Sequence, residues 1–178
     1  MNIRDIIKDY PDYPKQGIVF RDMWPVIDNP DAFQYILEEF EREFRGKIDT
    51  VIGIESRGFV FGAALANRLK ISFIPIRKKG KLPGETISRD FELEYGTASI
   101  EIKNESLKDR KILVIDDLLA TGGTVEAAVK MIETLDGNII GLGFLIELKF
   151  LNARKILSEY KNIRNITNGI DEYNAIYQ

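Results

Sequence analysis

The stretch VIDDLLATGGT, residues 114–124, decides which fold this sequence adopts. Its apolar beginning predicts a buried strand that delivers two adjacent carboxylates, Asp116 and Asp117, to the strand's carboxyl end. Residues 120–124 predict a small-residue loop that opens a helix, where free backbone N–H groups and the positive end of the helix dipole favour a phosphate. An isolated Thr-Gly-Gly also starts ordinary helices, but the acid pair before it favours a ligand site.

The loop has the chemistry of a phosphate cradle, because its threonines add hydroxyl donors and its glycines let the backbone approach a ligand closely. It consists of Ala120, Thr121, Gly122, Gly123 and Thr124. The two carboxylates cannot bind the phosphate itself, since like charges repel, so they need sugar hydroxyls or a metal as partners. A ribose 5-phosphate offers both kinds of group to this site.

The elements around this stretch alternate between strands and helices. Short apolar runs predict strands at residues 50–54, 71–76, 111–115 and 139–146. Helical spacing of apolar residues predicts helices after Asn29, after Gly58 and from Val125 to Leu135. This order predicts an α/β fold with a parallel sheet flanked by helices, and ligands at the carboxyl ends of the strands.

Residues 78–96 interrupt the alternation with several glycines and basic side chains. The segment is too long and polar for a plain connector. A loop of this length inside a compact domain is usually functional or disordered, so we expect a flexible loop at about residues 79–96.

Composition excludes several mechanisms. The 178 residues fit a single domain, and they include neither cysteine nor histidine, which removes thiolate and imidazole chemistry. Any proton transfer falls to Asp, Glu, Lys or Tyr, and any metal is a hard cation such as Mg²⁺. The net charge of −3 argues against a nucleic-acid partner. No stretch fits a signal peptide or a membrane span, which predicts a cytoplasmic protein.

The sequence contains no Walker motif and no G-x-G-x-x-G. The hypotheses of an ATPase and of a dinucleotide-binding protein therefore lose their main support. Residues 114–124 instead resemble the PRPP (5-phosphoribosyl-1-pyrophosphate) signature of type I phosphoribosyltransferases. Four further segments resemble the adenine-specific members of that family in the same order. They are GIVFRD (residues 17–22), ESRGFVFG (residues 55–62), IRKKGKLPGE (residues 76–85) and LEYG (residues 93–96).

The resemblance implies the type I phosphoribosyltransferase fold over residues 1–178, with a small hood from about residues 1–30 and the C-terminal segment. It implies a homodimer that makes AMP and pyrophosphate from adenine and PRPP, in purine salvage. It also implies Mg²⁺, held mainly through PRPP, with Asp116 or Asp117 as an additional ligand.

The resemblance also assigns roles to single residues. Asp116, Asp117 and the loop would bind the ribose and phosphate, and Glu94, beside Tyr95, would be the catalytic acid or base. The purine would lie between the hood residues Val19, Phe20 and Arg21 and, on its other face, Leu148. The pyrophosphate would be met by Arg57, Arg77, Lys78 and Lys81, some of them from the partner subunit. Many members have Asp where this chain has Glu55.

Other interpretations remain open at this point. Phe20 fits ordinary core packing, and the basic residues fit a solvated face. A xanthine or guanine phosphoribosyltransferase would share the PRPP site and differ in the hood. A PRPP-sensing regulator would need an added DNA-binding segment, for which the roughly sixteen residues before the hood motif are too few. A non-enzymatic interaction domain explains neither the acid pair nor the loop.

Overall fold

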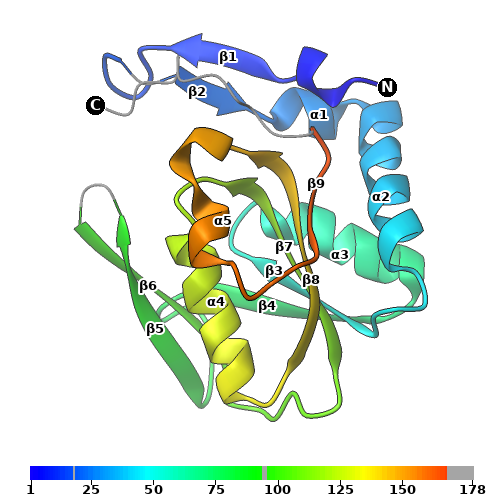
Figure 1. Ribbon diagram of the computed structural model, residues 1–178, viewed down its shortest axis with the longest axis vertical. Coiled ribbons are helices and arrows are strands. Elements are labelled where there is room, and N and C mark those ends of the chain that lie inside the picture. The colour runs from blue at the N-terminus through cyan, green and yellow to red at the C-terminus, as the bar shows by residue number, and fades with distance from the viewer. Residues whose placement is uncertain (18, 94–95, 168–178) are drawn as a thin grey trace.

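A mixed β-sheet forms the centre of the computed structural model, which describes residues 1–17, 19–93 and 96–167 (Figure 1). Five neighbouring strands in the order β4-β3-β7-β8-β9 run parallel, and β6 and β5 extend the β4 edge as an antiparallel hairpin. The strands are β3 (Thr50–Ile54), β4 (Ser72–Lys78), β5 (Thr86–Leu93), β6 (Gly96–Lys103), β7 (Lys111–Leu119), β8 (Asn138–Glu147) and β9 (Ile163–Asn165).

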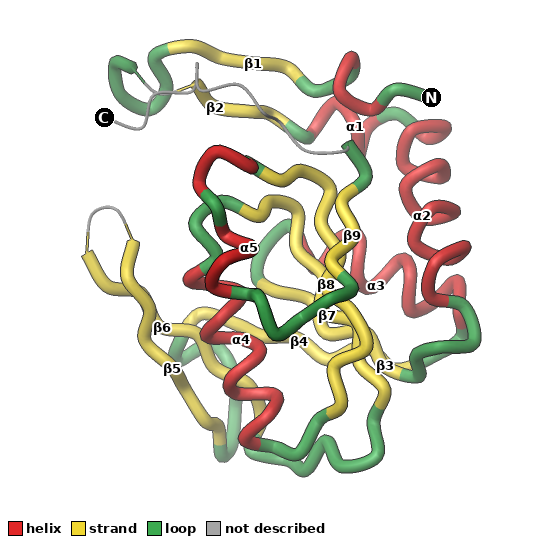
Figure 2. Tube along the Cα trace, viewed as in Figure 1, coloured by secondary structure: helices red, strands yellow, loops and turns green. Residues whose placement is uncertain are grey.

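Helices cover both faces of this sheet (Figure 2). The helices α2 (Pro30–Phe44) and α3 (Gly58–Leu69) pack on one face, and α4 (Gly123–Thr134) and α5 (Ala153–Ile156) pack on the other. Alternate residues of one strand serve the two layers: Val51 of β3 packs with the first pair of helices, and Ile52 packs with the second. The three-layer α/β architecture predicted from the sequence is therefore confirmed. Among the described helices, none is both long and apolar enough to cross a membrane.

Helix α2 illustrates how local sequence sets the packing. Its N-cap residue, Asn29, accepts a hydrogen bond from the Ala32 N–H at 3.0 Å, and Pro30 occupies the first turn. The helix then presses Phe44 against Gly141 of β8, where an added Cβ would lie 2.5 Å from the ring. The small residue in β8 thus allows the close approach of this helix to the sheet.

The N-terminal residues form a separate two-stranded sheet, in which β1 (Lys8–Pro11) pairs antiparallel with β2 (Val19–Asp22). The 3-10 helix η1 (Ile3–Asp5) precedes it, and α1 (Trp24–Asp28) follows it. In Figure 1 this small sheet lies beyond the end of the main sheet at which β7 and β8 finish. Its buried anchors are Ile3, Ile7, Met23 and Val26.

Three sequence expectations need correction. The expected loop at residues 78–96 contains the strand β5, which pairs with β6 over its whole length, so a hairpin replaces most of the loop. The strand expected at residues 111–115 continues to Leu119, because its second half pairs with β8. The strand expected to be buried at residues 71–76 is buried only at Ile76 and is exposed at Ser72, with the other positions half-buried, because α3 lies mainly over β3 and β7.

Candidate functional site

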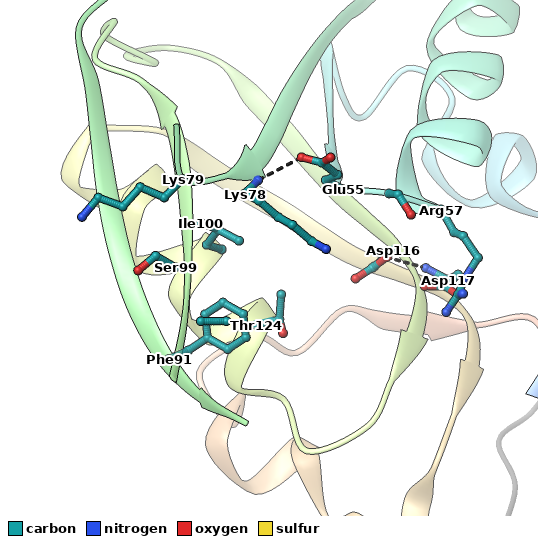
Figure 3. Close-up of a pocket in the computed structure, with 12 residues that line it drawn as sticks. Glu55, Arg57, Lys78, Lys79, Phe91, Ser99, Ile100, Asp116, Asp117 and Thr124 are labelled. Atoms are coloured by element: carbon teal, nitrogen blue, oxygen red, sulfur yellow. Dashed lines mark hydrogen bonds and ion pairs between the residues drawn. The ribbon is translucent and has the colours of Figure 1, made fainter. Parts of the chain in front are cut away.

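A cleft of about 750 Å³ opens between the ends of β3, β4 and β7 and the inner side of the β5–β6 hairpin (Figure 3). Its wall contains acidic, basic and apolar side chains. They are Glu55, Ser56, Arg57, Lys78, Lys79, Phe91, Ala98, Ser99, Ile100, Asp116, Asp117 and Thr124. The carboxyl ends of parallel strands are where α/β folds usually bind ligands, so this cleft is the first candidate site.

The loop after β7 has the conformation that its sequence predicts. Gly122 precedes the helix α4 with φ of +94°, a value that L side chains rarely adopt, and it is buried. Thr124 lines the cleft, and Thr121 and Gly123 line an adjoining hollow beneath β5. The loop therefore presents the start of α4, with its free backbone N–H groups, toward a position that an anion would favour.

The two carboxyls at the end of β7 lie in one small region. The Asp117 N–H donates to Asp116 Oδ1 at 2.8 Å, and the Asp117 carboxylate accepts a hydrogen bond from Arg57 Nε. Burial raises the pKa of Asp116 well above its usual value, and the nearby Asp117 carboxylate raises that pKa further. A site that crowds two carboxyls in this way favours hydroxyl donors or a cation as additional partners.

Glu55 organises the basic side of the cleft. Its carboxylate accepts hydrogen bonds from Arg77 Nε at 3.2 Å and Nη2 at 3.3 Å, and from the Lys78 N–H at 2.9 Å. Burial works to raise the Glu55 pKa, but the bonds from Arg77 and Lys78 outweigh it and the pKa is lowered. The ammonium end of Lys78 points across the cleft toward Asp116 (Figure 3).

Two of the four basic residues predicted for pyrophosphate belong to the described wall of the cleft. Arg57 and Lys78 line the cleft, whereas Arg77 and Lys81 are not among the described residues of its wall. Arg77 Nη1 donates to the Lys81 carbonyl oxygen at 3.1 Å, so its guanidinium bridges Glu55 and the following turn. The structure therefore gives Arg77 bonds within this subunit.

The residues predicted to contact the purine lie on different elements. Val19, Phe20 and Arg21 are half-buried on β2, and the Phe20 ring makes an edge contact with Tyr13 at 5.4 Å between centroids. Leu148 follows β8 and is only 1% exposed, within the same apolar cluster as the hood anchors. None of these four belongs to the described wall of the cleft.

Two predicted residues, Glu94 and Tyr95, lie outside the described residues. Sequence reasoning also missed several residues of the cleft. Phe91, Ser99 and Ile100 come from the hairpin, and the missed signal was the alternating polar and apolar pattern of its two strands. Lys79 was within the basic run but was not singled out.

The acidic residues can supply only part of a metal site. No group of three or more Asp or Glu side chains in the described ranges is arranged to hold a metal ion alone. Asp116 and Asp117 nevertheless offer the oxygen ligands that Mg²⁺ prefers. A cation at this cleft would therefore need further oxygens from a ligand.

Comparisons with known proteins agree on one family. The sequence profile of the phosphoribosyl transferase domain matches residues 30–175. An adenine phosphoribosyltransferase of Brachyspira hyodysenteriae is 48% identical over 162 residues, which cover 90% of this chain and 95% of that protein. One of Maridesulfovibrio salexigens is 49% identical over 160 residues, 89% of this chain and 94% of that protein.

A solved structure gives the same result. The adenine phosphoribosyltransferase of Thermoanaerobacter pseudethanolicus superimposes with a TM-score of 0.86 at 45% identity, covering 92% of this chain and 95% of that one. The mostly parallel sheet and its flanking helices thus match a structure of closely related sequence.

Proposed function

Since this chain belongs to the phosphoribosyl transferase domain family, we infer that it is an enzyme that transfers the 5-phosphoribosyl group of PRPP to adenine. The products are AMP and pyrophosphate, a reaction of purine salvage. The observation that carries this conclusion is near 48% identity to adenine phosphoribosyltransferases along nine-tenths of the chain. A Saccharomyces cerevisiae relative at 37% identity has been solved in complex with an imino-altritol bisphosphate and adenine.

We propose that the loop after β7 holds the 5-phosphate of PRPP. The loop consists of Ala120, Thr121 and Gly122 and continues into Gly123 and Thr124, the first two residues of α4. Backbone N–H groups at the start of α4 and the two threonine hydroxyls would donate to the phosphate oxygens. The adjacent acid pair, Asp116 and Asp117, would accept hydrogen bonds from the ribose hydroxyls. Support comes from the shared cleft wall, where both acids lie with Thr124.

We propose that Arg57 and Lys78 meet the pyrophosphate within one subunit. Both are cationic and line the cleft together with the acid pair. Arg57 uses Nε for Asp117, and its guanidinium has further donors for a phosphate oxygen. Arg77 and Lys81 lie outside the wall of this cleft in the described residues, so we assign their pyrophosphate contacts to the site of a partner subunit.

The purine is proposed to lie under the hood. Phe20 would stack on the base, the backbone of Val19 and Arg21 would read its amino edge, and Leu148 would contact the opposite face. The position of the small sheet beyond the carboxyl ends of the main strands supports this assignment (Figure 1). With this assignment the purine would lie on the same side of the main sheet as the phosphate loop.

We propose that Glu94, with Tyr95 beside it, donates a proton to the purine or accepts one from it. The chain has no histidine, so a carboxyl is the natural acid or base. Bond breaking at the anomeric carbon gives the ribose cationic character, and water must be kept away from it. We propose that residues 79–96 close over the bound substrates for this purpose.

Mg²⁺ is proposed as the cofactor, held mainly by PRPP oxygens with Asp116 or Asp117 as an additional ligand. When bound, the cation would neutralise charge on the departing pyrophosphate. The residues fit, because the two crowded carboxyls favour a positive partner. Excess EDTA should abolish AMP formation and added Mg²⁺ should restore it. Full activity in EDTA would exclude the metal.

We also propose that the protein is a homodimer and that it is located in the cytoplasm. The dimer is supported by the absence of Arg77 and Lys81 from the described wall of the cleft that contains Arg57. Mixing an Arg77→Ala subunit with an Arg57→Ala subunit should restore about a quarter of the wild-type activity if the sites are shared, because random exchange makes half of the dimers mixed and each mixed dimer has one intact site of two. No recovery in the mixed sample would contradict a shared site.

One assay tests the activity itself. The purified protein is incubated with PRPP, Mg²⁺ and adenine, and the release of AMP and pyrophosphate is measured. Guanine, xanthine and hypoxanthine are offered as competing bases. We expect AMP as the dominant product. Preference for guanine or xanthine would support the related phosphoribosyltransferases, and PRPP binding without turnover would support a regulator.

A further inference from the structure

A buried carboxylate lies directly behind the phosphate loop. Glu147 is the last residue of β8 and is only 2% exposed. It stands opposite Leu119, the last residue of β7, and the Leu148 N–H donates to the Leu119 carbonyl oxygen at 2.9 Å. Glu147 thus faces Leu119, and the phosphate loop begins at the very next residue, Ala120.

Glu147 joins three segments that are separate in the sequence. Its carboxylate accepts bonds from Arg154 Nε at 2.6 Å and Arg154 Nη2 at 2.8 Å, which is the two-pronged arrangement of a guanidinium on a carboxylate. Asn165 of β9 donates its Nδ2 to the same carboxylate at 2.7 Å. A buried charge held in this way fixes the positions of all its partners.

Arg154 belongs to α5, and its neighbour touches the phosphate loop. Ala153 lies against Gly122, where an added Cβ would be 3.2 Å from the Ala153 Cβ and 3.5 Å from its carbonyl oxygen. Both residues are buried. The helix that Glu147 holds is therefore the surface on which the loop rests, and any displacement of α5 is passed to Gly122 by direct contact.

We propose that Glu147 and Arg154 are positioning residues for the phosphate loop, which fix α5 behind Gly122 so that the loop is ready to receive the 5-phosphate. This inference rests on the proposed function. Neither side chain lines the described wall of the cleft, so their effect passes through Ala153 and Gly122. A site that must hold a phosphate with several N–H donors at once depends on such support, because small displacements misalign all the donors together.

The ion pair has a functional signature distinct from that of a purely stabilising pair. If α5 supports the loop, loosening the pair should weaken every ligand that carries the 5-phosphate, namely PRPP and AMP. Binding of adenine, which has no phosphate, should change little. A pair that only stabilises the fold would lower the unfolding temperature and leave both affinities as they are.

The test uses Arg154→Lys, which keeps the charge but cannot reach both carboxylate oxygens. The matched control is Arg68→Lys, because Arg68 pairs with Glu38 and Glu41 of α2 on the opposite face of the sheet. For Arg154→Lys we expect the AMP dissociation constant, measured by calorimetry, and the KM for PRPP to rise on the order of tenfold. The KM for adenine and kcat should stay within about twofold. Arg68→Lys should change none of these.

A second variant, Glu147→Gln, decides the question if Arg154→Lys does not fold, because Arg154 is half exposed and its guanidinium then remains solvated. Folded Arg154→Lys or Glu147→Gln protein with PRPP and AMP affinities like those of Arg68→Lys would overturn the proposal. A parallel rise in the KM of adenine would also overturn it. Wild-type protein that forms no AMP would instead contradict the proposed function, so the two failures are distinguishable.

Discussion

The phosphate loop and the N-terminal hood are held in place in different ways. The loop lies between two elements of the core, since β7 enters it from the buried sheet and α4 leaves it with Val125 and Ala128 buried. The hood strand β1 is exposed along its length, and β2 is half-buried. The small sheet reaches the core mainly through four apolar anchors, Ile3, Ile7, Met23 and Val26.

This difference has consequences for how each region binds. A loop fixed by core elements on both sides loses little conformational entropy when a ligand binds, and its N–H donors already point toward the ligand. A small sheet with few anchors can adjust to a base, and each of its contacts contributes less. We therefore expect substitutions at the phosphate end to cost more binding than substitutions in the hood.

The largest effect is expected for Asp117→Asn at the phosphate end. The change removes a charged acceptor, and a hydrogen bond to a charged group contributes about 1.5–3 kcal/mol, so PRPP affinity should fall on the order of thirtyfold. Thr121→Val should lower it less. Calorimetry with PRPP measures both, and Asp109→Asn, at an exposed carboxyl, is the control. Unchanged affinity in both site variants would contradict the phosphate-site assignment.

Glu94→Gln is expected to act on turnover instead of on binding. The amide keeps the shape of the side chain but cannot transfer a proton, and general acid or base groups contribute about 10²–10⁴-fold. We expect kcat to fall at least about tenfold. This is less than the full range, because stabilisation of the departing pyrophosphate supplies part of the rate enhancement. The KM for PRPP should move far less.

The control for Glu94→Gln is Glu105→Gln, at an exposed residue after β6. Steady-state rates between about pH 6 and pH 9 compare the two variants. A wild-type kcat for Glu94→Gln over that range would leave the catalysis to the metal and the basic side chains.

The same two regions show what sequence reasoning can reach. The strand, acid pair and loop at residues 114–124 are adjacent in the chain, so the local pattern predicted the strand and the helix start, and α4 begins at Gly123. The central strands and the helices α2 and α3 were also predicted, because each bears its own apolar periodicity.

The remaining features depend on contacts between distant segments. The hairpin was interpreted as a loop, since Arg89 interrupts the alternating pattern of β5 and its pairing with β6 is not a property of β5 alone. Glu55 and Arg77 were assigned separately, and only the fold brings their charged groups together. The hydrogen bonds that Arg154 and Asn165 donate to Glu147 could not be predicted from the local sequence for the same reason.

A smaller effect is expected in the hood, for Phe20→Ala. Loss of stacking on the base should cost about 1 kcal/mol, which corresponds to a rise of about fivefold in the KM for adenine. The KM for PRPP should stay unchanged. Phe20→Tyr keeps the ring and is the matched control. If Phe20→Ala raised the KM for PRPP more than that for adenine, the hood would not be the purine site and the contrast between the two regions would fail.

The smallest effect on turnover is expected at Glu101, which anchors the turn between β4 and β5. Glu101 is 3% exposed and accepts hydrogen bonds from the Lys81 and Leu82 N–H groups, each at 2.8 Å, and from the Thr86 hydroxyl at 3.2 Å. Burial works to raise the Glu101 pKa, but the donors outweigh it, and the pKa lies below its usual value.

The sign of this shift fixes the pH dependence of the anchor. A carboxyl with a lowered folded-state pKa stabilises the turn fully above its unfolded pKa, and this contribution is lost as the pH falls through the folded pKa. The Lys81 and Leu82 amides should therefore be protected from hydrogen exchange at neutral pH. They should lose this protection only at a pH below the usual pKa range of a glutamate.

Glu101→Gln should speed exchange of both amides at neutral pH and change kcat/KM only about twofold, because neither amide lies in the wall of the cleft. Exchange measured by mass spectrometry with and without PRPP separates this anchor from ligand-induced closure. Protection of these two amides that appeared only with PRPP would mean that the turn is ordered by the substrate and not by Glu101.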